Sequence, residues 1–220
     1  ANVSHQLRTP ITSIKGFSEK LLDGAYKDEG MALSSLEIIH QESNRLQMLI
    51  QDLLELSKIE QHGFSVDINP THLQEVLVRA ADLTSHRLEE KNMQFNVDFK
   101  EEVIVQGDAN RLIQIFTNLI YNAIMYSPEE TTVSIRLYKK DEWGIVEIED
   151  QGIGIQKNEI PRVFERFYRV DRARSRNTGD TGLGLAIVKH LVEAHHGKIQ
   201  VESEVGKGTT MRIFLPLHIS

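Results

Sequence analysis

The sequence contains no cysteine, one tryptophan and only five prolines among its 220 residues. The absence of cysteine excludes disulfides, thiolate metal sites and cysteine nucleophiles, and is compatible with a reducing compartment. No apolar run approaches the roughly 18 residues of a membrane-spanning helix, and the first residues lack the pattern of a signal peptide. The formal net charge is −7, so we expect no basic footprint for nucleic acid. We therefore expect a soluble, cytosolic protein of one or two domains.

Residues 1–62 have the periodicity of two long helices. In the first, a heptad seam is formed by Leu7, Ile11, Ile14, Ser18, Leu21 and Ala25. A second apolar stripe runs from Leu36 to Ile59, after a break within residues 23–30. The short connection predicts an antiparallel hairpin. Because a hairpin alone buries little apolar surface, we expect it to pair with a second copy as a dimeric four-helix bundle. The alternative is that it packs on its own C-terminal domain.

From residue 66 onward, strands and helices are interleaved. The pattern predicts strands at 66–68, 93–99, 103–105, 132–138, 143–148, 199–203 and 211–215, and helices at 73–88, 111–126 and 183–195. Asp108 is the expected N-cap of the second of these helices, which must end before Pro128. Two strand pairs form hairpins, so the sheet must be mixed. The predicted fold class is α+β: a helical hairpin followed by a two-layer α/β sandwich with a mixed sheet.

The first candidate for chemistry is the histidine in segment 4–10, which reads Ser-His-Gln-Leu-Arg-Thr-Pro. His5 lies about 200° around the helix from Leu7 and therefore points to solvent, and Thr9 lies one turn later on the same face. Pro10 lacks an N–H and so bends the helix beside His5. An exposed imidazole can act as a nucleophile near neutral pH. The alternative is an ordinary surface histidine, since the chain has nine.

Two glycine-containing segments have features of a nucleotide site. Asp150 ends a predicted strand, where its carboxylate can accept a hydrogen bond from a base, and Gly152 and Gly154 allow close approach of the backbone. The alternative is a simple turn. The run 179–185 opens the last helix, where free N–H groups attract phosphate, but it is not a Walker loop. The segment before this run is rich in arginine, and we expect it to be a mobile lid that contacts phosphate rather than a solvated basic loop. Its arginines are Arg162, Arg166, Arg169, Arg172, Arg174 and Arg176.

Asn118 and Asn122 lie four residues apart on the predicted helix 111–126, so both amides lie on one face. Amide oxygens suit a Mg²⁺ ion that keeps several waters and bridges substrate phosphates. The alternative is ordinary polar surface.

In this order, the segments strongly resemble the cytoplasmic core of two-component sensor histidine kinases, with a phosphoacceptor hairpin and a GHKL-type ATP-binding domain. The resemblance covers essentially the whole chain and is similar in character to phosphate-regulon and cell-wall sensor kinases of Gram-positive bacteria. The matching segments are the phosphoacceptor box at 4–10, the asparagine box at 118–123, the phenylalanine box at 164–169, the second glycine box at 182–189, and the ending at 206–216.

The resemblance implies a dimerisation and histidine phosphotransfer domain at residues 1–62 and a catalytic ATP-binding domain at residues 66–220. His5 would be the phosphoacceptor, and Gln6 would occupy a position that is usually acidic. Thr9 would orient water for a phosphatase reaction toward the response regulator, whose receiver-domain Asp would accept the phosphoryl group.

The resemblance also implies the ligands of ATP and Mg²⁺. Asp150 would bind the adenine amino group, and Asn122, with Asn118, would hold Mg²⁺. The remaining ATP-binding residues would be Tyr126, Gly152, Gly154, Arg169, Thr181, Gly182, Leu183, Gly184, Leu185 and Thr209.

Three positions depart from the family pattern. Gln6 replaces a carboxylate, Met125 replaces a lysine, and Asp180 replaces a glycine beside the phosphates. A neutral amide can orient the imidazole but cannot take up its proton. All three changes act toward weaker phosphoryl transfer, so a phosphatase-biased or kinase-impaired enzyme is one alternative.

Two further alternatives are a non-catalytic, nucleotide-gated scaffold that binds a receiver domain, and another ATPase of the same fold, of the gyrase, chaperone or mismatch-repair type. The helical hairpin with its histidine box favours a sensor kinase over such an ATPase. Because the chain begins close to His5, we expect a fragment: the cytoplasmic portion of a membrane-anchored bacterial sensor, attached to the membrane only through missing upstream segments.

Overall fold

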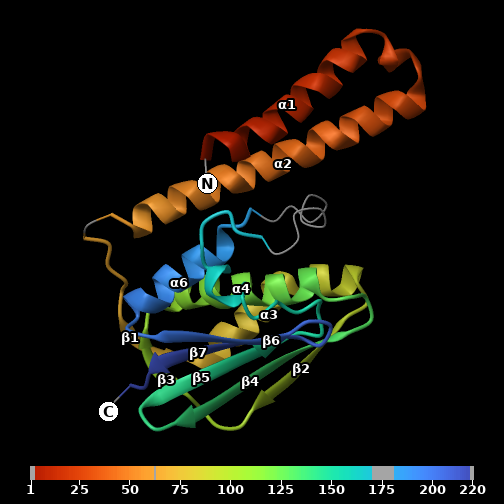
Figure 1. The fold of residues 1–220 in the computed structure, drawn as a ribbon. Coiled ribbons are helices and arrows are strands. Elements are labelled where there is room, and N and C mark those ends of the chain that lie inside the picture. The colour runs from red at the N-terminus through yellow and green to blue at the C-terminus, as the bar shows by residue number, and fades with distance from the viewer. Residues whose placement is uncertain (1–2, 62, 170–180, 219–220) are drawn as a thin grey trace.

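A computed structural model describes residues 3–61, 63–169 and 181–218. The N-terminal part is the predicted helical hairpin (Figure 1), made of α1 (Val3–Leu22), the short 3₁₀ helix η1 (Ala25–Lys27) and α2 (Glu29–Ile59). Gly24 makes the turn with a φ of +114°, a left-handed conformation that glycine adopts without strain. Asp28 caps α2, because its side chain accepts a hydrogen bond from the Met31 N–H at 2.8 Å.

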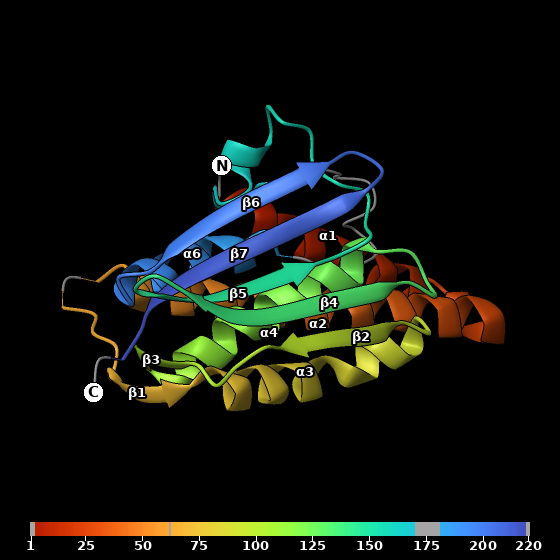
Figure 2. The same cartoon turned by 90° about the horizontal axis from the view of Figure 1, so that it is seen from below.

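The C-terminal part contains a five-stranded mixed sheet with the described helices α3, α4 and α6 on one face (Figures 1 and 2). The strand order is β2-β4-β5-β7-β6; β2 and β4 are parallel, and the other neighbours are antiparallel. The mixed-sheet prediction is confirmed. The elements are β1 (Asn69–His72), α3 (Leu73–Glu90), β2 (Gln94–Phe99), β3 (Ile104–Gly107), α4 (Ala109–Tyr126), β4 (Thr132–Lys140), β5 (Trp143–Glu149), η2 (Ile160–Arg162), α6 (Gly184–Ala194), β6 (Lys198–Glu204) and β7 (Gly208–Pro216).

The strand predicted at residues 66–68 is wrong. The strand in this region is β1, which begins at Asn69, directly after the predicted segment ends. It pairs antiparallel with β3 as a separate two-stranded sheet. Its register is held by the Thr71 hydroxyl, which donates to the Gly107 carbonyl at 2.8 Å. Ile68, one of the apolar residues that suggested the prediction, is 40% exposed and lies just before the first residue of β1.

The core lies between the sheet and helices α3, α4 and α6, and α2 joins it. Leu49, Leu56 and Ile59 of α2 are buried in the same apolar cluster as the sheet. The hairpin therefore packs on its own C-terminal domain, as the alternative prediction stated. Its other side leaves large apolar side chains exposed at Ile11, Leu22, Leu33, Leu36, Ile50 and Leu54. None of the described helices is both long and apolar enough to cross a membrane.

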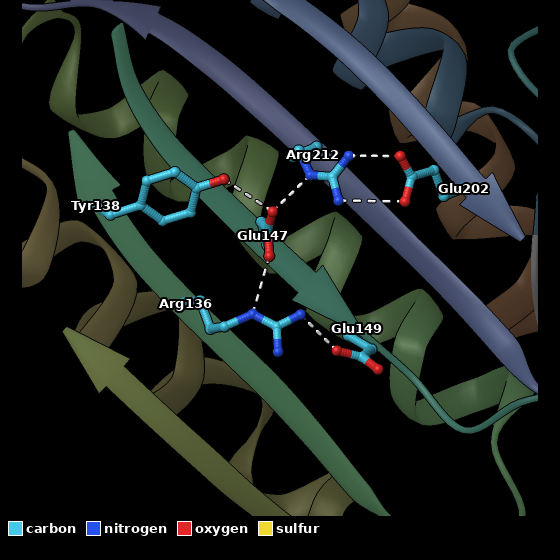
Figure 3. A network of polar contacts seen from close by, with 6 residues as sticks. All are labelled: Arg136, Tyr138, Glu147, Glu149, Glu202 and Arg212. Carbon is cyan, nitrogen blue, oxygen red and sulfur yellow. Dashed lines mark hydrogen bonds and ion pairs between the residues drawn. The ribbon is translucent and has the colours of Figure 1, made fainter. Parts of the chain in front are cut away.

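The face of the sheet opposite the helices carries a polar network across four strands (Figure 3). Glu147 of β5 is only 8% exposed and lies at its centre. It accepts hydrogen bonds from Arg212 at 2.5 Å, Arg136 at 2.9 Å and the Tyr138 hydroxyl at 2.9 Å. The two arginines extend the network to Glu202 and Glu149.

Candidate functional site

A cavity lies among α4, the loop after β5 and the start of α6. Nine of the predicted ATP-binding residues line it, from segments that are far apart in the sequence: Asn122, Tyr126, Asp150, Gly154, Arg169, Gly182, Gly184, Leu185 and Thr209. Tertiary packing thus gathers the asparagine, Asp-x-Gly-x-Gly and glycine-run segments around one space.

Asp150 follows the last residue of β5, and its carboxylate lies at the wall of the cavity. Its Oδ1 accepts hydrogen bonds from the N–H groups of Gly152 at 2.8 Å and Thr209 at 3.1 Å. Burial raises the pKa of this carboxyl to about 6, although the two backbone hydrogen bonds oppose the shift. The group is therefore ionised at neutral pH, and Oδ2 can accept a hydrogen bond from a ligand in the cavity.

Glycine is required at two points where the backbone closes around this space. Gly154 has a φ of +69°, and a Cβ there would lie 2.1 Å from the Glu204 carbonyl oxygen. Gly182 has a φ of +72°, and its carbonyl accepts a hydrogen bond from the Phe167 N–H at 2.8 Å. Any other residue at either position would have to displace backbone atoms.

The two asparagines occupy different places. Asn122 lines the cavity, whereas Asn118 lies one turn earlier, where its Oδ1 is 3.9 Å from the position of a Cβ on Gly184. In the described ranges no group of three His, Asp or Glu side chains could hold a metal ion by itself. The amide oxygen that Asn122 can offer to the cavity is of the kind that suits a cation which also binds substrate phosphates.

Helix α4, which carries both asparagines, is fixed at its two ends. Asp108 is the N-cap, as predicted, since its Oδ1 accepts from the N–H groups of Asn110 and Arg111. At the other end, the Lys91 ammonium donates to the carbonyls of Ile124 at 2.7 Å and Ser127 at 2.5 Å. A cation is favoured at a helix C-terminus, and α4 has no basic residue in its own last turn.

Four predicted ATP-binding residues do not line the cavity: Asn118, Gly152, Thr181 and Leu183. Gly152 contributes its N–H to Asp150 instead. The Thr181 hydroxyl donates to Asp52 of α2 at 2.5 Å and thus links the glycine run to the hairpin. Asp180 and the arginines at 172, 174 and 176 lie outside the described residues.

The phosphoacceptor candidate is on the hairpin. His5 is exposed near the start of α1, as predicted, and its carbonyl accepts a hydrogen bond from the Thr9 hydroxyl at 3.3 Å. Gln6 is half-buried, and Pro10 is buried inside the helix. In the described part of the chain, no hydrogen bond joins His5 to the residues of the cavity.

The apolar wall of the cavity was missed by the sequence analysis. It is formed by Leu119, Ala123, Ile148, Ile153, Ile155, Val163, Tyr168 and Met211. Part of this wall had a usable signal: Leu119, Asn122, Ala123 and Tyr126 are spaced i, i+3, i+4 and i+7, so they share one face of α4. The residues from β5 and β7 had no such signal, because their proximity depends on strand order.

Comparison with known proteins identifies two family matches. Residues 107–219 match the family described as "Histidine kinase-, DNA gyrase B-, and HSP90-like ATPase". Residues 1–62 match the "His Kinase A (phospho-acceptor) domain".

Curated relatives are similar over nearly the whole chain. The sensor histidine kinase WalK of Bacillus subtilis is 40% identical over 98% of this chain and 36% of its own length. The phosphate regulon sensor protein PhoR of Pseudomonas aeruginosa is 37% identical over all of this chain and 50% of its own length. The chain thus spans a half or less of these two relatives.

Two solved structures share the fold over 98% of this chain. The histidine kinase AdeS of Acinetobacter baumannii superposes with a TM-score of 0.77 at 28% identity and is itself 98% covered. The histidine kinase ThkA, solved in complex with the response regulator protein TrrA, superposes with a TM-score of 0.78 at 24% identity and is 60% covered.

Proposed function

Since the chain belongs to the histidine kinase-, DNA gyrase B- and HSP90-like ATPases and carries a His Kinase A domain, it is a sensor histidine kinase core, and we propose how its residues act. In this proposal ATP binds in the cavity, His5 accepts the γ-phosphoryl group, and an aspartate of a response regulator then takes it. The observation that carries the proposal is the cavity itself, in which the carboxylate of Asp150 lies among apolar side chains and the polar residues Asn122, Arg169 and Thr209.

The base of ATP fits the Asp150 end of the cavity. The two N–H groups on Oδ1 fix the carboxylate, so that Oδ2 accepts the amino group of adenine. Ile148, Ile153 and Met211 offer apolar contact to the ring. The phosphates then extend toward Arg169 and the glycine run, where α6 begins without a side-chain cap from its N-cap residue, Leu183.

Transfer to His5 is an in-line displacement. The lone pair of one ring nitrogen forms the N–P bond, the bond from the γ-phosphorus to the bridging oxygen breaks, and ADP leaves with that electron pair. The proton on the other ring nitrogen is then released to water. Mg²⁺, held by Asn122 and Asn118, would supply charge neutralisation on the phosphates. This chain's residues contribute position and electrostatics.

The partner in this proposal is the receiver domain of a response regulator. Support comes from ThkA, which shares the fold and was solved with the response regulator TrrA. Thr9 would orient the water that hydrolyses the regulator's phospho-aspartate, because its hydroxyl lies exposed one turn from His5. Gln6 favours this phosphatase direction over autophosphorylation.

We also propose that the chain divides into two domains: residues 1–62 form the phosphotransfer domain, and residues 66–220 form the ATP-binding domain. Helix α2 ends at Ile59, and the pairing of β1 with β3 ties residues 69–72 to the second domain. Both curated relatives are at least twice as long as this chain, which supports a cytoplasmic core within a larger membrane-anchored sensor.

The test is phosphorylation with Mg²⁺ and γ-³²P-labelled ATP. We expect an acid-labile, alkali-stable label that is lost in His5→Gln and retained in His40→Gln, a change at another exposed histidine of the hairpin. ATP binding without any label would indicate the nucleotide-gated scaffold. Absence of both binding and label would refute the proposed function.

A further inference from the structure

Arg45, in the middle of α2, is a buried charge without adequate partners. Its side chain is 8% exposed, and Nε has no hydrogen-bond partner among the described residues. The nearest carboxylate oxygen, Oε2 of Glu42, is 3.9 Å from a terminal nitrogen, which is too far for a hydrogen bond. That Glu42 oxygen is itself unpartnered. Burying a guanidinium costs folding free energy unless its N–H donors have acceptors, so the fold keeps this group at a cost to its stability.

Arg45 faces the ATP-binding domain. It shares one face of α2 with Leu49, Asp52 and Leu56, at spacings of four, seven and eleven residues. The two leucines are buried in the common core, and Asp52 accepts the hydroxyl of Thr181, the residue before Gly182 of the cavity. Because seven residues of helix span about 10 Å, Arg45 lies about two turns along α2 from the glycine run.

Arg45 also lies level with the phosphoacceptor on the neighbouring helix. His5 is 22 − 5 = 17 residues before the end of α1, and Arg45 is 45 − 29 = 16 residues after the start of α2. In an antiparallel hairpin, both positions are therefore about 25 Å from the turn. Along α2, Arg45 is thus at the level of His5 and about two turns from the point where Asp52 meets the glycine run.

We propose that Arg45 is a catalytic residue that contacts the phosphoryl group as it passes from ATP to His5, an inference that rests on the proposed function. The charge on the γ-phosphoryl oxygens is redistributed as the N–P bond forms and the bond to ADP breaks. The Nε–H of this planar guanidinium has no hydrogen-bond partner among the described residues, and a terminal nitrogen reaches Glu42 only at 3.9 Å, so the two can donate to two of these oxygens. Glu42 then holds the arginine in place without occupying Nε.

The experiment compares initial rates of His5 labelling at saturating Mg-ATP with calorimetric affinity for ADP, in the natural chain and in Gln6→Glu. We expect Arg45→Met to lower the labelling rate about a hundredfold while ADP affinity changes less than about threefold. Arg45→Lys keeps the positive charge but loses the planar arrangement of donors that contacts two oxygens, so we expect an intermediate labelling rate. Ser35→Ala, another buried position on the inner side of α2, is the matched control and should label normally.

Three outcomes would overturn the inference. Unchanged labelling in a folded Arg45→Met variant would leave Arg45 as a structural ion pair, and equal losses of rate and ADP affinity would make it a nucleotide-binding residue. If Arg45→Met does not fold, a natural rate in Arg45→Lys would exclude the forked contact. Failure of the unmodified chain and Ser35→Ala to bind ATP or to label would instead refute the proposed function.

Discussion

At the scale of single residues, the charged carboxylate of Asp150 favours nucleotide binding but lowers the stability of the fold. Its carboxylate is ionised at neutral pH in a site that disfavours charge, and burial raises its pKa from 3.8 to about 6. A folded-state pKa above the unfolded value means that the folded protein prefers the protonated form. The resulting destabilisation is absent below the unfolded pKa and fully present above about pH 6.

Asp150→Asn should therefore stabilise the fold while it weakens nucleotide binding. We expect a higher Tm than the natural chain at pH 8, with little difference near pH 4, because the amide carries no buried charge. Calorimetry should show weaker ATP binding by roughly 1–3 kcal/mol, since the acceptor for the adenine amino group is replaced. In the natural chain, ATP affinity should fall as the pH falls through 6.

Asp98→Asn, at an exposed position of β2, is the matched control and should change neither quantity. An Asp150→Asn variant that binds ATP as tightly as the natural chain would show that the base lies elsewhere.

A second residue-scale prediction concerns Gln6. A carboxylate beside His5 stabilises the imidazole as its other N–H becomes more acidic, and general-base assistance is typically worth about 10²–10⁴-fold. Gln6→Glu should therefore raise the rate of His5 labelling markedly, whereas hydrolysis of the regulator's phospho-aspartate should change little. Gln47→Glu, at an exposed position of α2, should have no effect on labelling. Rapid stoichiometric labelling of the natural chain, with no gain in Gln6→Glu, would contradict this account.

At the scale of elements, the strands around Asp150 are cross-linked by the network in Figure 3. Burial alone would raise the pKa of Glu147, but hydrogen bonds from Arg212, Tyr138 and Arg136 outweigh it and lower the pKa. A lowered pKa means that Glu147 contributes stability above its unfolded pKa, and that this contribution is lost as the pH falls through the folded value.

Glu147→Gln should thus lower the free energy of unfolding at pH 7 by about 2 kcal/mol, because two arginines lose a charged acceptor. The difference from the natural chain should be smaller at an acidic pH below the lowered folded-state pKa, where the natural side chain becomes protonated. Urea unfolding at both pH values measures it, with the exposed Glu142→Gln as control. An equal difference at both pH values would mean that the charge of Glu147 is not responsible.

At the scale of the whole molecule, the hairpin has two apolar sides with different partners. The side with Leu49, Leu56 and Ile59 is buried on the ATP-binding domain of the same chain. Polar contacts reinforce this packing, because Glu55 pairs with Arg111 and Glu60 pairs with Arg166 and, at 3.3 Å, with His190. The opposite side is too apolar to remain in water, which favours a second copy.

We expect the chain to be a dimer of about 50 kDa by light scattering, twice its 25.1 kDa. Leu36→Lys combined with Leu54→Lys should yield a monomer, because both side chains are more than half exposed on α2. Leu83→Lys is the control, since Leu83 is 52% exposed on α3 of the ATP-binding domain. A natural chain that is monomeric at micromolar concentration would contradict the prediction.

The sequence by itself determined the helical hairpin, the mixed sheet, the N-cap at Asp108 and most residues of the cavity. These features depend on local periodicity, capping chemistry and the order of short motifs, which are properties of neighbouring residues. Only the tertiary structure decided that β1 begins at Asn69, that Thr181 faces Asp52, and that the Nε of the buried Arg45 donates no hydrogen bond to any described residue. Each of these depends on which distant segment packs alongside, and contacts between residues up to 129 positions apart follow from the packing of helices and strands rather than from local sequence.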